Sequence, residues 1–304
     1  MKKKILIIGG TGFLGYHLAK KCIKKGWSVT SISTHKPKKI RFLENVKYLS
    51  VNIININQLK KKIKLDYDYV VNFGGYVDHK EKKKTFNSHY IGCKNLVDYF
   101  LESKKLKLFI QIGSSVEYGA SKSPQKENLK INIKKLRSTY GIAKLLATRY
   151  LIKKNLEINF PCVILRPYLI FGPNQDFNRL IPIVIKSCIE NNNFPCSHGK
   201  QLRDFLYVDD FISAIFKCFS NRNIIGEIFN IGTSKPLKVR DVISQIKNTL
   251  KKGHPIYGKL RMRDDEIVNL FPHTGKIKKK LKWSTKVEFA SGLKKTINYY
   301  KKTL

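Results

Sequence analysis

Short apolar runs alternate with longer amphipathic stretches through the first half of the chain. Apolar and β-branched runs, typical of buried strands, lie at 4–8, 28–33, 46–51, 69–73, 106–112 and 160–166. Stretches with apolar residues at helical spacing lie at 13–25, 82–103 and 137–154. This order predicts a parallel sheet with helices on both faces, and such sheets bind ligands beyond the carboxyl ends of their strands.

The alternation weakens in the second half, where Pro173, Pro182, Pro195 and Pro236 interrupt it. We therefore expect an α/β fold with a Rossmann-type, doubly wound parallel sheet over residues 1–170. A smaller, mainly substrate-binding C-terminal lobe is expected over 171–304, with some segments returning to the sheet. Since no repeat or low-complexity linker separates the two parts, we expect them to pack around one cleft.

Composition allows a large folded domain, and we expect the protein to stay in the cytoplasm. The 304 residues are 42% apolar, which is enough to form a sizeable core. No window approaches the roughly 18 apolar residues that a membrane helix needs, and the basic N-terminal strand does not resemble a signal peptide. The six cysteines lack metal or redox spacing, so we expect reduced, mostly buried thiols and no metal site.

The formal net charge of +39 raises nucleic acid as a possible partner class. However, the lysines are distributed along the whole chain, without a nucleic-acid-binding module or interleaved aromatic residues. We therefore expect no nucleic-acid partner and attribute the abundance of Lys, Ile and Asn to a biased genome. The positive field would still attract phosphorylated ligands.

A glycine-rich segment joins the first predicted strand to the first predicted helix. It has the spacing G-x-x-G-x-x-G over residues 9–15. Glycine allows the backbone to turn tightly and approach a pyrophosphate, whose charge the helix N-terminus then stabilises. This arrangement predicts a dinucleotide site that includes Gly9, Thr11, Gly12, Phe13, Leu14 and Gly15.

The end of the second predicted strand bears on which dinucleotide binds. NAD-binding sheets usually place an acidic residue there, roughly 20 residues after the glycines, to hold the ribose hydroxyls. This chain has Ser33, Thr34, His35 and Lys36 instead. A carboxylate would repel a 2′-phosphate, whereas these groups suit it. Because lysine is abundant everywhere, the missing acid is the main reason why we expect NADP(H) to be favoured, with NAD(H) as the alternative.

Two segments supply candidate catalytic groups. Ser114 follows the strand predicted at 106–112, and Tyr140 and Lys144 lie four residues apart, hence on one face of a helix. An ammonium group beside a phenol stabilises the phenolate, so the tyrosine exchanges a proton closer to neutral pH than its free pKa of about 10 allows. We therefore predict that Tyr140 is a general acid or base.

With these motifs the chain resembles the extended short-chain dehydrogenase/reductase superfamily, and within it the NAD-dependent epimerase/dehydratase family. That family contains nucleotide-sugar epimerases, dehydratases and 4-keto reductases. The resemblance extends nearly end to end. It includes the glycine motif, Ser114 with the Tyr140/Lys144 pair, the segments 166–173 (RPYLIFGP) and 199–210 (GKQLRDFLYVDD), and Trp283.

The resemblance implies roles for individual residues. Ser114 would hydrogen-bond the reacting sugar oxygen, Tyr140 would transfer its proton, and Lys144 would also bind the nicotinamide ribose. A nucleoside-diphosphate sugar would be the ligand, and a homodimer the assembly. The sugar nucleotide's diphosphate would be held by Asn178, Arg203 and Arg263, whose guanidinium groups suit a dianion.

Three positions depart from the family pattern. Leu169 and His89 replace asparagines, and Asn52 replaces an aspartate that usually contacts adenine, although we retain Asn52 as a cofactor-binding candidate. We expect four histidines to be ordinary polar or core residues without a partner that suggests catalysis: His79, His89, His198 and His273.

The residues after Ser114 separate the possible reactions, and we expect Ser115 and Val116 to face the substrate. A 4,6-dehydratase needs an Asp-Glu pair at this place, and double-epimerising reductases use a cysteine there. Valine carries no proton, and Glu117 should point away from the side of Val116 because side chains alternate along an extended segment.

Two reactions therefore stay open, and both need only serine, tyrosine, lysine and a nicotinamide. We favour NADPH-dependent reduction of the C4 keto group of a nucleoside-diphosphate (6-deoxy)hexose, in nucleotide-sugar biosynthesis. The alternative is an NAD-dependent nucleotide-sugar 4-epimerase, which returns the hydride that it removes. A non-catalytic sugar-nucleotide or NADP(H) sensor is a weaker third hypothesis.

Overall fold

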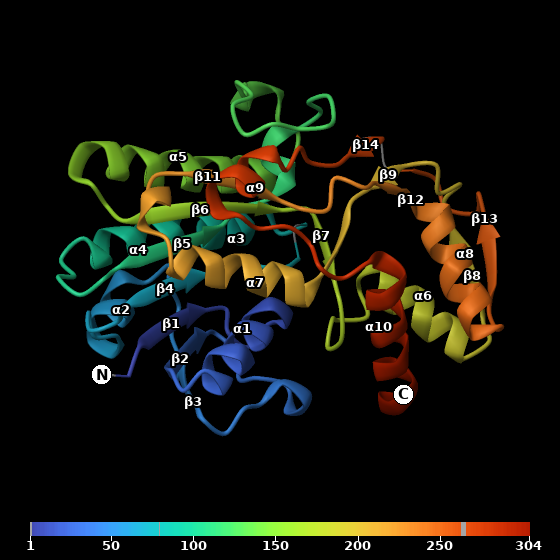
Figure 1. The fold of residues 1–304 in the computed structure, drawn as a ribbon, viewed down its shortest axis with the longest axis horizontal. Coiled ribbons are helices and arrows are strands. Elements are labelled where there is room, and N and C mark those ends of the chain that lie inside the picture. The colour runs from blue at the N-terminus through green and yellow to red at the C-terminus, as the bar shows by residue number, and fades with distance from the viewer. Residues whose placement is uncertain (1, 79, 263–265) are drawn as a thin grey trace.

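The computed structural model describes residues 2–78, 80–262 and 266–304, and it contains one sheet of seven parallel strands (Figure 1). The strand order is β11-β6-β5-β4-β1-β2-β3, and every neighbouring pair is parallel. This confirms the predicted Rossmann-type α/β fold. The strands of the sheet are β1 (Lys4–Ile8), β2 (Ser28–Ser33), β3 (Val46–Ser50), β4 (Tyr69–Asn72), β5 (Leu108–Ile112), β6 (Cys162–Pro167) and β11 (Ile228–Ile231).

Alternate side chains of each strand enter two apolar cores on opposite faces of the sheet. In β1, Ile5 and Ile7 belong to one core, and Leu6 and Ile8 to the other. The first core is covered by α1 (Phe13–Lys24) and α7 (Val208–Phe219), and the second by α2 (Ile56–Lys62), α4 (Gly92–Phe100) and α5 (Thr139–Ile158).

The helical stretch predicted at 82–103 contains an irregularity. It forms α3 (Lys82–Phe86), a π-helical turn η2 (Asn87–Ile91) and then α4, which ends at Phe100. A π turn inserts an extra residue and changes the direction in which the following side chains point. Helical periodicity alone does not reveal such a turn, so the single helix of the prediction is corrected here.

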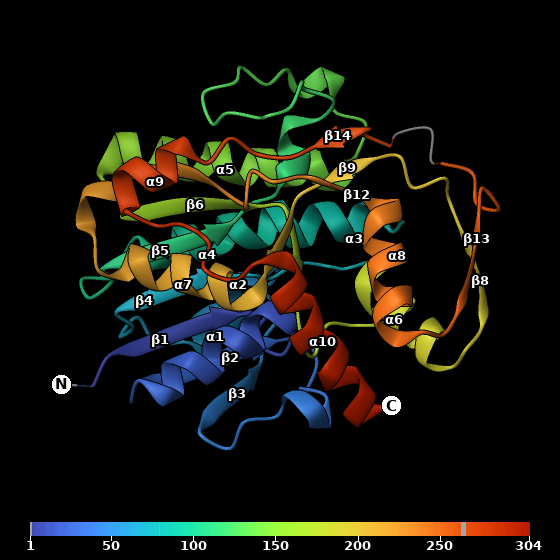
Figure 2. The same ribbon diagram turned by 45° about the vertical axis from the view of Figure 1, so that its right-hand side comes forward.

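Most of the remaining elements gather beyond the carboxyl end of the sheet, as both ribbon views show (Figure 2). Their strands are two to four residues long and form small sheets of two or three strands. These elements are β7 (Leu169–Phe171) with β10 (Phe205–Tyr207), β8 (Asn193–Cys196) with β13 (His254–Tyr257), β9 (Leu202–Arg203) with β12 (Leu237–Lys238) and β14 (Asn269–Leu270), and the helices α6 (Leu180–Ile189), α8 (Val239–Leu250) and α10 (Phe289–Thr303). The helix α9 (Gly275–Leu281) instead packs beside β11 of the main sheet.

All six cysteines are buried, and none forms a disulfide. Burial raises the pKa of the Cys22 thiol to about 12, which keeps it protonated and unreactive. Within the described ranges, no helix combines the length and the apolar character that crossing a membrane would require.

Candidate functional site

The glycine segment makes a tight connection between β1 and α1. Gly9 has a φ of +73°, and its amide donates to the carbonyl of Ile32 in β2 at 2.8 Å. A Cβ on Gly15 would lie 2.5 Å from the backbone of Gly9 and Gly10, so α1 packs directly on the loop. Gly12 caps α1 without a side-chain hydrogen bond, Thr11 lies in the turn before it, and Phe13 and Leu14 are the first two residues of the helix. This geometry fits a dinucleotide pyrophosphate at the helix N-terminus.

The candidate ribose-binding residues follow β2 at the same edge of the sheet. Ser33 is half-buried, and its hydroxyl accepts from the amide of His35 at 3.5 Å; Thr34, His35 and Lys36 are exposed. Asn52 follows β3, is exposed, and accepts from the amide of Ile54 at 3.1 Å. These residues therefore lie at or just beyond the carboxyl ends of β2 and β3, the edge at which sheets of this kind bind ligands.

Ser114 stands at the carboxyl end of β5 and caps the short helix η3 (Ser115–Tyr118). Its hydroxyl accepts from the amide of Val116 at 3.4 Å, and its amide donates to Glu117 at 2.8 Å. Ser115 is buried and Val116 is half-buried. The serine is thus held at the strand end by a reciprocal cap.

Tyr140 and Lys144 lie in the first two turns of α5. The Lys144 ammonium is buried, donates to the carbonyl of Ile112 at 2.7 Å, and lies 5.8 Å from the centre of the Tyr140 ring. A Cβ on Gly141 would lie 3.0 Å from the Val116 carbonyl oxygen. Because the start of α5 passes so close to η3, the structure brings these two residues to the strand end that carries Ser114.

His89 is a buried residue, as expected, and it packs against the candidate catalytic tyrosine, a contact that the sequence did not indicate. Its ring meets the Tyr140 ring edge to face, with the centres 4.8 Å apart, and its Nε2 lies 3.1 Å from the Tyr76 carbonyl oxygen. Gly75 provides the space, since a Cβ there would lie 1.8 Å from the imidazole. The signal in the sequence was the replacement of an asparagine at position 89. The contact itself depends on the π turn η2.

The other histidines are placed differently. His198 and His273 are exposed, and the Nδ1 atom of His273 accepts from the amide of Gly275 at 3.3 Å. His79 lies outside the described residues.

The Glu117 carboxylate is buried in the interior, but residues 115–118 form the short helix η3, so the alternation of an extended segment on which its expected orientation was based does not occur. Glu117 is fully buried and forms an ion pair with Arg166, whose Nη2 and Nε lie 2.7 and 2.8 Å from the same carboxylate oxygen. The Thr148 hydroxyl donates to that oxygen at 2.8 Å. Burial alone would lower the pKa of Arg166, but the neighbouring charge of Glu117 raises it, so the guanidinium stays charged. Glu117 is therefore a structural group.

The candidate diphosphate-binding residues lie in different elements of the second half. Asn178 is exposed in the turn before α6. Arg203 is buried in β9, donates to the carbonyls of Leu202 at 2.8 Å and Val268 at 3.2 Å, and pairs with Glu266. Arg263 lies outside the described residues.

Comparisons with known proteins agree with this geometry. The model of the NAD dependent epimerase/dehydratase family matches residues 5–232. The chain is 27% identical to UDP-N-acetyl-alpha-D-glucosaminuronate decarboxylase of Bacillus cytotoxicus, covering 99% of this chain and 98% of the relative. It is 26% identical to CDP-abequose synthase of Salmonella muenchen, covering 98% of each.

A solved structure shows the same fold over the whole length. UDP-glucose 4-epimerase of Thermotoga maritima with UDP-glucose aligns with a TM-score of 0.91 and 25% identity, covering 99% of both chains. The family match spans the glycine loop, η3 and the start of α5, which are the elements that form the candidate site. The chain therefore belongs to the NAD-dependent epimerase/dehydratase family of the extended short-chain dehydrogenase/reductase superfamily, and it is an enzyme of that family.

Proposed function

We propose that the protein reduces the C4 keto group of a nucleoside-diphosphate (6-deoxy)hexose with NADPH, in nucleotide-sugar biosynthesis. The observation that supports this most is the cluster of Ser114, Tyr140 and Lys144 beside a half-buried valine at position 116. The relatives are named for reactions on nucleotide-linked sugars, which supports the substrate class.

Each residue of the cluster has a role in this proposal. Tyr140 protonates the alkoxide formed at C4, and the ammonium of Lys144 stabilises the phenolate that results. Ser114 donates a hydrogen bond to the carbonyl oxygen of the sugar. Lys144 also binds the nicotinamide ribose, since an ammonium group has three donors and Ile112 accepts only one of them. When bound, the nicotinamide supplies the hydride.

The same cluster disfavours dehydration and inversion at C3 or C5. Those reactions need a second acid or base near the neighbouring carbons, and neither Ser115 nor Val116 is suited to that task. Glu117 is the nearest carboxylate along the chain, but it is engaged by Arg166 and Thr148.

An NAD-dependent 4-epimerase is the second candidate, because it uses the same three residues. The likeness to the epimerase of Thermotoga maritima favours it. We prefer the reductase because Ser33, Thr34, His35 and Lys36 leave no acid at the end of β2, which favours NADPH, the usual donor for a net reduction.

The substrate's diphosphate is assigned to Asn178, Arg203 and Arg263 in the lobe formed mainly by residues 171–304, with Ser115 and Val116 facing the sugar. Guanidinium groups match the geometry of phosphate oxygens. Arg203 would then exchange part of its contact with Glu266 for the ligand. A homodimer is proposed as the assembly.

The reaction is tested with dTDP-, CDP- and UDP-linked 4-keto-6-deoxyglucose. We expect one NADPH to be consumed per sugar, with release of the 4-hydroxy sugar and no loss of water. In deuterated water, the product should carry no deuterium on the ring carbons. Deuterium at C3 or C5 would contradict the proposal, and inversion at C4 of an unoxidised sugar nucleotide without net NADPH use would establish the epimerase.

The cofactor preference is tested separately, by fluorescence titration of NADPH and NADH. We expect tighter binding of NADPH, and we expect Ser33→Asp to shift the preference toward NADH because a carboxylate at this position repels a 2′-phosphate. Equal or reversed affinities in the wild-type protein would remove the main reason to prefer the reductase over the epimerase.

A further inference from the structure

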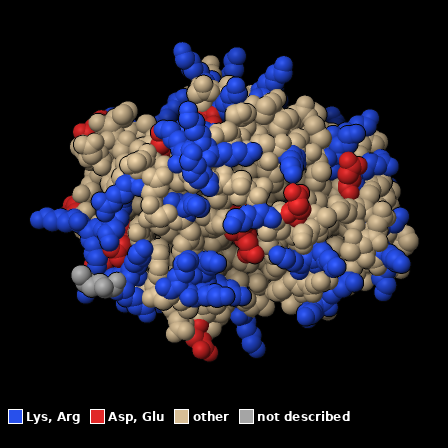
Figure 3. Space-filling view, in the orientation of Figure 1, with Lys and Arg blue, Asp and Glu red and all other residues tan. Residues whose placement is uncertain are grey.

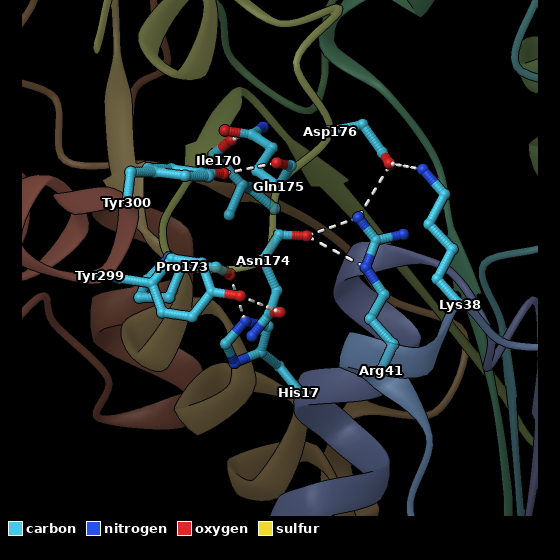
Figure 4. A network of polar contacts seen from close by, with 10 residues as sticks. All are labelled: His17, Lys38, Arg41, Ile170, Pro173, Asn174, Gln175, Asp176, Tyr299 and Tyr300. Carbon is cyan, nitrogen blue, oxygen red and sulfur yellow. Dashed lines mark hydrogen bonds and ion pairs between the residues drawn. The ribbon is translucent and has the colours of Figure 1, made fainter. Parts of the chain in front are cut away.

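The loop after β2 is fixed to a turn from the second half of the chain (Figure 4). Arg41 in the short helix η1 (Lys39–Arg41) donates from Nε to the carbonyl of Asn174 at 3.0 Å, and its Nη2 lies 2.9 Å from a carboxylate oxygen of Asp176. Lys38 lies 2.7 Å from the other oxygen of Asp176. One carboxylate therefore holds two cations of the loop in which the candidate ribose-binding residues lie.

The turn that presents Asp176 is itself anchored from two helices. His17 of α1 hydrogen-bonds the carbonyl of Pro173 at 2.9 Å, and the Tyr299 hydroxyl of α10 donates to the side chain of Asn174 at 2.6 Å. Tyr300 donates to the carbonyl of Gln175. The backbone on both sides of Asn174 is thus held by hydrogen bonds, so Asp176 is presented to the loop from a well-defined position.

The two cations differ in how they could respond to a ligand. The Arg41 side chain is only 4% exposed and is also bound to Asn174, so it stays in place. The Lys38 side chain is 66% exposed and could reach another anion if Asp176 released it. Burial alone would raise the pKa of Asp176, but the hydrogen bonds from Lys38 and Arg41 outweigh burial and the net pKa is lowered. The carboxylate is therefore ionised at neutral pH.

Because of these contacts, the loop after β2 is less positively charged than its own sequence indicates. Residues 33–41 contain four cations and no acid, which suggests a strongly positive site for a 2′-phosphate. Asp176 adds a negative charge to that loop and occupies Lys38 and Arg41. A 2′-phosphate near Lys38 would have to compete with the carboxylate for the ammonium group and would be repelled by it.

We propose that Asp176 is a cofactor-specificity determinant, which weakens NADPH binding relative to NADH by holding Lys38 and adding negative charge to the loop after β2. Both effects are electrostatic, and so Asp176 affects the phosphorylated dinucleotide more than the unphosphorylated one. The inference rests on one part of the proposed function, namely that the loop after β2 contacts the adenosine ribose of the cofactor.

The test is the ratio of the dissociation constants of NADH and NADPH, measured by fluorescence titration at low salt. Asp176→Asn should raise this ratio about fivefold or more, since it removes the charge and releases Lys38. Asp176→Ser should act in the same direction, and Asp176→Glu, which keeps the charge, should leave the ratio within twofold. Adding Lys38→Gln to Asp176→Asn should cancel most of the gain.

Asp66→Asn is the matched control. It removes the same charge from an aspartate of similar exposure that pairs with Lys4 at 2.6 Å, at the amino end of β1. Its ratio should stay within twofold of wild type. An unchanged or lower ratio in folded Asp176→Asn and Asp176→Ser proteins would overturn this inference alone. Failure of the wild-type protein to bind either dinucleotide would overturn it together with the proposed function.

Discussion

Tyr140 is a residue whose ring and hydroxyl have separable tasks. The ring packs edge to face on His89, and the Lys144 ammonium lies 5.8 Å from the ring centre. Burying an ammonium group is costly unless it is hydrogen-bonded, and the Ile112 carbonyl provides one such bond at 2.7 Å. The packing therefore fixes the orientation of the phenol, whereas proton transfer depends on its oxygen alone.

Tyr140→Phe removes that oxygen and keeps the ring, so we expect kcat to fall by about a thousandfold or more while folding is little affected. Tyr150→Phe is the control, because Tyr150 lies on the same helix and its hydroxyl contacts Asp98 instead. Steady-state kinetics and thermal unfolding of both variants provide the measurement. Activity of Tyr140→Phe within tenfold of wild type would show that the proton donor is another group.

At the same scale, the sequence revealed some site residues and not others. Ser114, Tyr140 and Lys144 are recognisable because their types and spacing already describe the chemistry. The contacts of His89 with Tyr140 and of Asp176 with Lys38 join residues far apart in the chain, and they depend on a π turn and on an anchored turn. No local pattern carries that information, so only the structure shows them.

At the scale of elements, the glycine loop and α1 are in direct backbone contact. Backbone atoms of Gly9 and Gly10 occupy the space where a side chain on Gly15 would begin, and neither can shift easily because Gly9 also bonds to Ile32 of β2. The loop, the helix and two strands therefore form one rigid unit on which the pyrophosphate would rest.

Gly15→Ala should disrupt this unit, because its Cβ would lie 2.5 Å from the Gly9 carbonyl oxygen. We expect the free energy of unfolding to fall by about 1–3 kcal/mol and dinucleotide affinity to fall at least tenfold. Gly26→Asn tests whether any glycine change near α1 does the same. Gly26 has open space around it and a φ of +73°, which asparagine tolerates. Similar dinucleotide affinities in both variants would contradict the proposed role of the loop.

The elements of the sheet were the most predictable part of the fold. Strand β1 has the predicted bounds because a strand buried on both faces is a continuous apolar run, whereas β2, with the sequence SVTSIS, is recognisable from its β-branched residues. Strands of the second half are only two to four residues long and pair in small sheets, so they show no period that a pattern can detect. β11 also lies there, although it pairs with β6 in the main sheet.

At the scale of the whole molecule, positive charge dominates the surface. Lysine and arginine number 60 against 21 aspartates and glutamates, and Figure 3 shows basic side chains in several places over the visible face rather than gathered in one region. Several of the acids are already neutralised in ion pairs, such as Asp68 with Lys107 at 2.8 Å and Glu227 with Lys276 at 2.7 Å. The folded chain therefore repels itself more than an expanded chain does.

This self-repulsion predicts that salt stabilises the protein. The Debye length falls from about 30 Å at 0.01 M to about 8 Å at 0.15 M salt, so repulsion between distant lysines is screened within that range. We expect Tm to rise by about 2 °C or more between these concentrations of sodium chloride, measured by differential scanning calorimetry. Choline chloride at equal ionic strength should give the same rise if screening is the cause. A constant or falling Tm would show that the ion pairs, which salt weakens, outweigh the repulsion among the excess cations.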